Sequence, residues 1–116
     1  MLESRSGLAT VDGLFNAIGV RAAQSVTAVT VVGRGGVAVD AAAVVLNVTV
    51  TDPQASGFVT VFPCGSDRPN ASSLNYVAGA TVANAVVVRV GVGGQVCLFS
   101  QAATDLIADV NGYFPP

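Results

Sequence analysis

Alternating apolar and polar positions are clearest in the middle of the chain, over residues 42–65. Four aliphatic residues take every second position there, namely Val44, Leu46, Val48 and Val50. A period of two places such a set on one face of an extended strand. Asp52 and Pro53 then favour a turn that ends at Gly57, and residues 58–63 resume with aromatic and β-branched types that favour strands. The pattern predicts a β-hairpin with one buried face.

Further stretches with strand character, separated by glycine or polar turns, follow along the chain. They cover residues 25–32, 37–39, 71–77, 81–90, 95–100 and 104–114. Residues 81–90 carry apolar side chains on both faces, so we expect this strand to be central in its sheet. The glycine-rich segments 33–36 and 91–94 are expected to be turns between strands, the second of them a hairpin turn.

The number and spacing of these strands predict an all-β fold. About eight short, mostly antiparallel strands favour a single β-sandwich, with a small barrel as the alternative. The chain of 116 residues is long enough for one domain. We expect residues 1–116 to form it, with an irregular N-terminal arm over 1–24 and the β core over 25–114.

The composition then removes several functional classes. Hydrophobic residues make up 52 % and charged residues 10 %, against a usual ~25 % charged. No apolar run reaches the ~18 residues of a membrane-spanning helix, so we expect no membrane insertion. The five basic residues are all Arg and are scattered, so we expect no nucleic-acid binding. The chain has no His, which removes the commonest general base and metal ligand; we expect no enzymatic activity and no cofactor.

Two cysteines, Cys64 and Cys97, allow two interpretations. They are either two buried thiols of a cytosolic protein or one disulfide of an exported protein, and we favour the disulfide. A closed loop of this length stabilises a fold by about 3–4 kcal/mol in the chain-entropy model. The first residues have neither the basic start nor the apolar segment of a signal peptide. We therefore expect the chain to be a domain of a longer exported protein.

Four segments resemble a domain of secreted actinobacterial proteins. They are LNVTVTDPQASGFVTVFPCG (46–65), RPNASSLNY (68–76), QVCLFS (95–100) and ATDLIADVNGYF (103–114). That domain often occurs in tandem or is appended to secreted hydrolases and surface proteins. Its copies usually open with a stretch similar to Arg-Leu-Leu-Asp-Thr-Arg, which Leu2-Glu3-Ser4-Arg5 matches in part, with Glu3 where Asp is common. The resemblance implies export, a Cys64–Cys97 pair and a non-catalytic role.

Charged residues near the two ends of the chain suggest two further features. We predict that Arg5 and Asp109 form a charge-assisted pair that ties the arm to the last strand, because a planar guanidinium matches a carboxylate; the alternative is that both are exposed. Asp105, Asp109 and Asn111 alternate along the last strand, and Ca²⁺ takes such oxygen ligands. This metal site is the weaker interpretation, since Asp105 is expected to be solvated, and we expect no bound metal.

The polar segment 66–75 is the best candidate contact surface. Its donors and acceptors suit sugar hydroxyls, and an aromatic ring follows them: the candidate residues are Asp67, Arg68, Asn70, Ser72, Asn75 and Tyr76. The alternative is a loop whose side chains only satisfy its own backbone.

Three functional classes remain. We favour a non-catalytic module of a secreted or cell-surface protein, serving as a structural, adhesive or spacer domain next to other domains of a longer chain. The second class is a module that binds a glycan or cell-wall polymer. The third is a self-assembling subunit, because a chain with no Lys and few charges does little to protect its strand edges from pairing with another copy.

Overall fold

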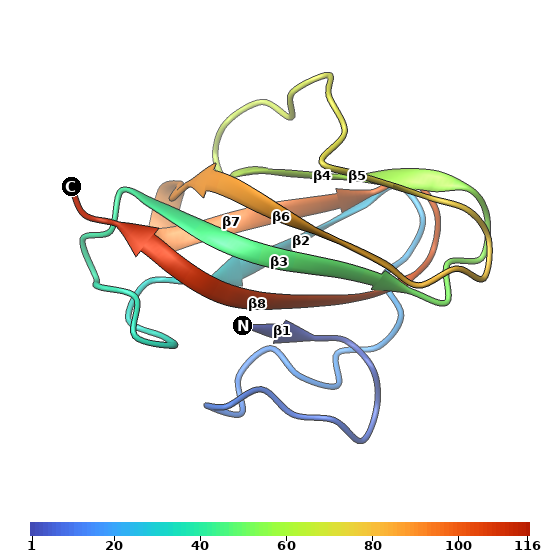
Figure 1. The fold of residues 1–116 in the computed structure, drawn as a ribbon, viewed down its shortest axis with the longest axis horizontal. Helices are drawn as coiled ribbons and strands as arrows, with labels where there is room; N and C mark the ends of the chain where they lie inside the picture. Colours follow the sequence, from blue (N-terminus) through green and yellow to red (C-terminus); the bar gives the residue numbers. More distant parts are fainter.

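The computed structural model describes residues 1–116 as two four-stranded sheets that pack face to face (Figure 1). One sheet has the order β1-β8-β3-β6 and the other β2-β7-β4-β5, and all strand pairs are antiparallel. The elements are β1 (Leu2–Glu3), β2 (Ser25–Thr30), β3 (Ala43–Thr51), β4 (Gly57–Pro63), β5 (Leu74–Tyr76), β6 (Val82–Arg89), the 3-10 turn η1 (Val92–Gly94), β7 (Gln95–Ser100) and β8 (Asp105–Phe114). The predicted all-β sandwich is confirmed.

The core lies between the two sheets and is built mainly from valine and leucine. The four alternating aliphatic residues of β3 are at most 1 % exposed, and they face residues from β2, β4 and β7 of the other sheet. Those facing residues include Val29, Val59, Val96 and Leu98, which are equally buried. The period of two therefore identified the buried face of β3 correctly.

The predicted hairpin over residues 42–65 is wrong. β3 and β4 follow one another in the chain but belong to different sheets, with β3 between β8 and β6 and β4 between β7 and β5. The turn between them carries the chain from one layer to the other. Alternation shows which face of a strand is buried, but it does not show which strand lies beside it.

The placement of β6 and its neighbours also differs from the expectation. β6 is an edge strand rather than a central one, and its outer side chains, such as Ala83, Ala85 and Val87, are small and exposed. Residues 91–94 do not form a hairpin turn, because they lead from β6 to β7 in the other sheet. Residues 37–39 do not form a strand: Val37 and Ala38 are irregular and Val39 begins a turn, whereas the predicted turn at 33–36 is present.

The N-terminal arm is irregular apart from β1, which pairs with β8. Leu2 is buried at 1 % exposure. Ser4 Oγ donates a hydrogen bond to Asp105 Oδ1 (2.7 Å) and accepts one from the Leu106 N–H (2.8 Å). Ser4 thus joins the arm to the start of β8 with both the donor and the acceptor of its hydroxyl group.

Candidate functional site

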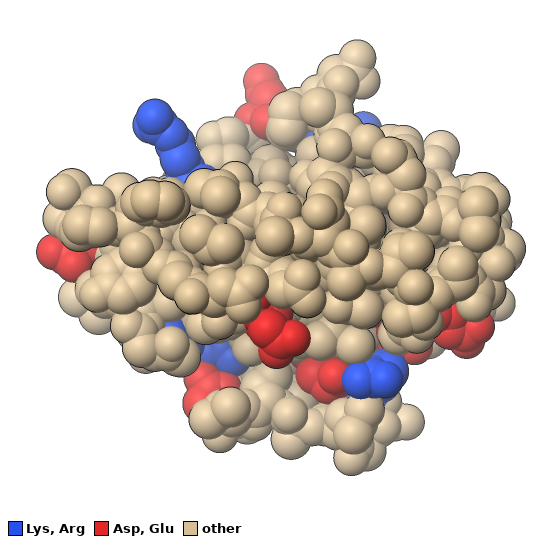
Figure 2. Space-filling view, in the orientation of Figure 1, with Lys and Arg blue, Asp and Glu red and all other residues tan.

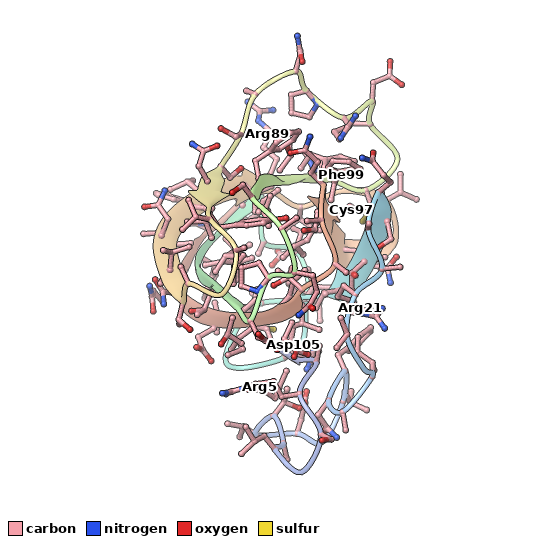
Figure 3. The ribbon with its side chains drawn as sticks, turned by 90° about the vertical axis from the view of Figure 1, so that its right-hand side faces the viewer. Arg5, Arg21, Arg89, Cys97, Phe99 and Asp105 are labelled. Atoms are coloured by element: carbon pink, nitrogen blue, oxygen red, sulfur yellow. A yellow bond between two sulfur atoms is a disulfide. The ribbon has the colours of Figure 1, made fainter.

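A second apolar cluster covers part of the outer face of the β2-β7-β4-β5 sheet. Phe62, Cys64, Cys97 and Phe99 are buried there, and Phe58 packs against them. The outer face of a two-layer sandwich normally faces water. Here the segment 65–73, which we call the platform loop, folds over it; Figure 3 shows this loop above the labelled Phe99 and Cys97.

The disulfide lies within this cluster. Cys64 follows the end of β4 and bonds to Cys97 of the neighbouring β7, with a distance of 5.1 Å between the two Cα atoms. The predicted pair is confirmed, and no cysteine is free. The bond fixes the base of the platform loop to the sheet.

Several contacts hold the platform loop to the sheet. The Arg68 guanidinium lies 3.6 Å from the centroid of the Phe99 ring, a cation–π contact. Thr60 Oγ1 donates a hydrogen bond to the Ala71 carbonyl (2.8 Å), and Ser73 Oγ accepts one from the Val61 N–H (3.0 Å). The loop is therefore attached at its start, middle and end.

A hollow of about 230 Å³ opens between the platform loop and β4. It is lined by Phe58, Pro69, Asn70, Ala71, Ser72 and Asn75. Three of the predicted contact residues, Asn70, Ser72 and Asn75, are thus brought together. Their side chains are exposed, and the side-chain hydrogen bonds of this region are made by Thr60, Ser73 and Asn84 instead.

The other three predicted contact residues do not line this hollow. Arg68 stacks on Phe99, and Asp67 is exposed elsewhere on the loop. The prediction for Tyr76 is wrong, because its side chain points into the sandwich and is 5 % exposed. Its hydroxyl lies 2.8 Å from Ser100 Oγ and accepts a hydrogen bond from the Ala102 N–H (3.0 Å). Alternation along β5 directs Asn75 outward and therefore Tyr76 inward.

A buried polar cluster around Arg34 was not predicted from the sequence. The side chain of Arg34 is buried and its Nε and Nη2 atoms bind the two carboxylate oxygens of Asp12 at 2.6 and 2.9 Å. It also donates to the carbonyls of Thr30 and Leu14 and lies 4.9 Å from the Phe15 ring centroid. The pKa of Asp12 is held well below its usual range, chiefly by the hydrogen bonds from Arg34 and then by the Leu14 N–H.

This arginine serves to hold the arm, since its donors are committed to the chain itself. A hollow of about 270 Å³ lies beside it, lined by Met1, Val11, Asp12, Arg34, Gly35, Asp109 and Val110. The contact between Arg34 and Asp12 spans 22 residues, so no local spacing could indicate it. From the sequence, Arg34 was assigned only to the turn at residues 33–36.

The predicted pair of Arg5 and Asp109 is wrong. Arg5 binds Glu3, with Nε to Oε1 at 2.8 Å and Nη2 to Oε2 at 3.0 Å, and this contact lowers the pKa of Glu3. β1 runs antiparallel to β8, so that Glu3 lies opposite Ile107, and Arg5 therefore follows toward the Asp105 end. Asp109 lies in the middle of β8, beyond Ala108, the partner of Leu2, and its side chain is exposed.

The candidate metal ligands are not brought together either. Asp105 and Asp109 are four residues apart on β8, which separates their Cα atoms by roughly 13 Å in an extended strand. Asp105 also accepts the hydrogen bond from Ser4. No group of three or more acidic, His or Cys side chains lies close enough to hold an ion, so Asp105, Asp109 and Asn111 do not form a site.

Charge is unevenly distributed over the surface. Figure 2 shows that most charged side chains on the visible face lie along the lower side of the view, near β8 and the arm. β3 carries no charged residue, and the one charged residue of β6 is the exposed Arg89 at its end. The only helical segment is a single 3-10 turn, so no helix here could span a bilayer.

No protein-family model, curated protein or solved structure matches the chain. The resemblance to a domain of secreted actinobacterial proteins therefore stays a prediction, and the function is argued from the geometry of the platform loop.

Proposed function

We propose that the chain is a non-catalytic module of an extracellular or cell-surface protein, and that it displays the platform loop as an adhesive contact surface. The observation that carries this proposal is that the loop has two sets of side chains with different contacts. One set, together with neighbouring residues of the sheet, holds the loop in place, and the other set makes no hydrogen bonds within the chain.

The holding residues are specific in their contacts. Arg68 lies over Phe99, Thr60 binds the Ala71 carbonyl, and Ser73 binds the Val61 amide. These contacts restrict the backbone of the loop in the unbound protein. A surface that is already ordered loses less conformational entropy on binding, which favours affinity.

The free residues are polar and project from the restricted backbone. Asn70, Ser72 and Asn75 offer amide and hydroxyl groups that both donate and accept hydrogen bonds, and all three are exposed. A loop that only satisfied its own backbone would use such side chains internally. Their availability supports a role in contact with a partner.

Two further features support a display role outside the cell. Disulfides persist mainly in oxidising compartments, and the Cys64–Cys97 bond braces the base of the loop. The platform loop also lies on the side of the molecule away from the N-terminal arm, as Figures 1 and 3 show. Attachment through the arm therefore leaves the loop accessible.

An adhesion assay tests the proposal. The chain, coupled to beads through its N-terminus, is incubated with purified bacterial cell-wall sacculi, and the retained fraction is measured. The variant Asp67→Ala/Asn70→Ala/Ser72→Ala removes free polar groups of the loop, and the matched control Asp109→Ala/Asn111→Ala removes exposed polar groups of the opposite sheet. We expect retention of the native chain and the control, and at least a tenfold loss for the loop variant. No retention of the native chain, or equal retention of both variants, would refute the proposal.

A further inference from the structure

The hollow beside Phe58 is small and has a defined lining. Its volume of about 230 Å³ is below the roughly 300–1,000 Å³ of sites for drug-sized ligands. A group the size of one ring fits it better than an extended chain segment. Any larger ligand would extend from it over the exposed surface of the loop.

The lining carries no charge. Among its six residues the polar groups are two amides and one hydroxyl, from Asn70, Asn75 and Ser72. Arg68 is the one basic residue of the loop, and it packs on Phe99 instead of lining the hollow. A phosphate or carboxylate would meet no cation here, whereas a neutral ligand with neighbouring hydroxyls would find groups that both donate and accept.

Phe58 supplies the aromatic part of the hollow, whose apolar lining also includes Pro69 and Ala71. Its ring is half-buried, and it packs at 45° against Phe99 with 5.9 Å between the centroids. Phe58 pairs directly with Asn75 across β4 and β5, which places the two side chains about 5 Å apart at Cβ. An aromatic ring next to an amide suits a ligand that has a face of C–H groups and a rim of hydroxyls, as a pyranose has.

The positions of these groups are fixed by the strands and by the loop contacts. Phe58 and Asn75 lie on paired strands, while Asn70 and Ser72 flank Ala71, whose carbonyl is bound by Thr60. The hydrogen bond from the Val61 amide to Ser73 fixes the next position. The polar groups are therefore held around the ring rather than left to a mobile loop.

We infer that this hollow is a binding subsite for one neutral hexopyranose unit, either a hexose or an N-acetylhexosamine, of an extracellular polysaccharide. The inference rests on the proposed function, because it names the ligand class that the platform loop contacts. A ring-sized ligand in so small a site is expected to bind weakly, with a Kd on the order of 1 mM. Useful adhesion would then need several copies or several contacts.

An NMR titration of the intact chain tests the inference. Neutral probes, namely glucose, mannose, galactose and N-acetylglucosamine, are added singly up to tens of millimolar while the amide signals are recorded. We expect saturable shifts for at least one probe, centred on residues 58, 69–72 and 75. The absence of saturable shifts with every neutral probe, or shifts centred elsewhere, would overturn the inference.

Variants locate the binding groups. Asn70→Ala and Asn75→Ala change exposed side chains that make no hydrogen bonds within the chain, and each is expected to raise the Kd at least fivefold. Asn111→Ala, an exposed amide on the opposite sheet, is the matched control and should leave the Kd unchanged. Equal affinity of all three variants would contradict the assignment, as would binding of glucuronic acid or a proline-rich peptide in place of the neutral probes.

The two proposals fail separately. If the triple loop variant loses adhesion to sacculi but neutral sugars cause no shifts, the display function stands and the saccharide subsite is wrong. If neutral sugars bind at the hollow but the native chain is not retained on sacculi, the subsite stands and the adhesive role is wrong.

Discussion

Opening the disulfide is predicted to weaken the whole domain substantially. Cys64 and Cys97 are 33 residues apart, and the chain-entropy model gives about 3.7 kcal/mol for closing a loop of that length. Domains of this size are stable by only about 5–15 kcal/mol, so the loss is a large share. With an unfolding entropy of about 2.1 cal/mol/K per residue, it corresponds to a fall in Tm of about 15 °C.

The effect is expected to be strongest around the platform loop. Phe58, Phe62 and Phe99 form the outer cluster together with the two sulfurs, and this cluster has no second sheet to cover it. Without the bond, the end of β4 loses its covalent link to β7 and keeps its hydrogen bonds to β7 and the one that the Cys64 carbonyl accepts from the Val92 N–H (2.8 Å). Amide hydrogen exchange in residues 65–73 should therefore accelerate more than exchange in β3.

Thermal unfolding followed by circular dichroism measures the effect. The oxidised chain is compared with the reduced chain and with Cys64→Ala/Cys97→Ala, and reductant added to the double variant is the control, since it should change nothing there. A reduced chain whose Tm lies within about 3 °C of that of the oxidised chain would refute the reasoning, because a constraint on the unfolded state cannot then contribute as calculated.

Three further predictions concern single residues. Gly91→Ala would press a Cβ against backbone atoms of residues 63 and 64, whereas the Cβ of Gly112→Ala meets nothing within 4 Å. Denaturant unfolding should show that Gly91→Ala lowers the free energy of unfolding by about 1–3 kcal/mol and that Gly112→Ala changes it by less than about 1 kcal/mol. Equal effects of the two substitutions would contradict the packing around Gly91. Thr27 Oγ1 is buried without a partner, so Thr27→Val should stabilise by about 1 kcal/mol in the same assay, and destabilisation would show that the hydroxyl is satisfied. Arg34 lowers the pKa of Asp12 from its ordinary value of 3.8. The ion pair therefore stabilises the fold fully above about pH 4, and this contribution is lost as the pH falls toward the lowered pKa. From about pH 5 to pH 2 the Tm of Asp12→Asn should fall less than that of the native chain, and parallel curves would count against the pair.

The sequence predicted the strands well because burial imposes a local signal. The pattern placed β3, β4, β7 and β8 within a residue or two of their true bounds. β3, β4 and β7 each have a buried face along most of their length, and β8 has one over its first half. The pairing of strands was not predictable in the same way. A turn at Asp52 and Pro53 permits a reversal within one sheet or a crossing to the other, and the choice depends on contacts with β7 and β8 far along the chain.

The exposed polar residues of the candidate site were predicted from local composition, whereas its aromatic residue and the Arg34 cluster depend on contacts between distant segments. Polar loop composition correctly indicated that Asn70, Ser72 and Asn75 are exposed, and the register of β4 and β5 then placed Phe58 beside them. Tyr76 was misplaced although a strand was expected over residues 71–77, because the period of two, which puts Tyr76 on the same buried face as Leu74, was not applied to it. Arg34 was missed since its partner Asp12 lies in an arm without any periodicity.

The order of the platform loop is the most direct test of the whole account, because a preformed surface is what both proposals require. Backbone ¹⁵N relaxation of the oxidised chain would report the order parameters of residues 66–73. We expect order parameters near those of rigid backbone, about 0.85, as in β4 and β7. Values below about 0.6 across the loop would mean that the contacts of Arg68, Thr60 and Ser73 do not hold it, and would contradict the account.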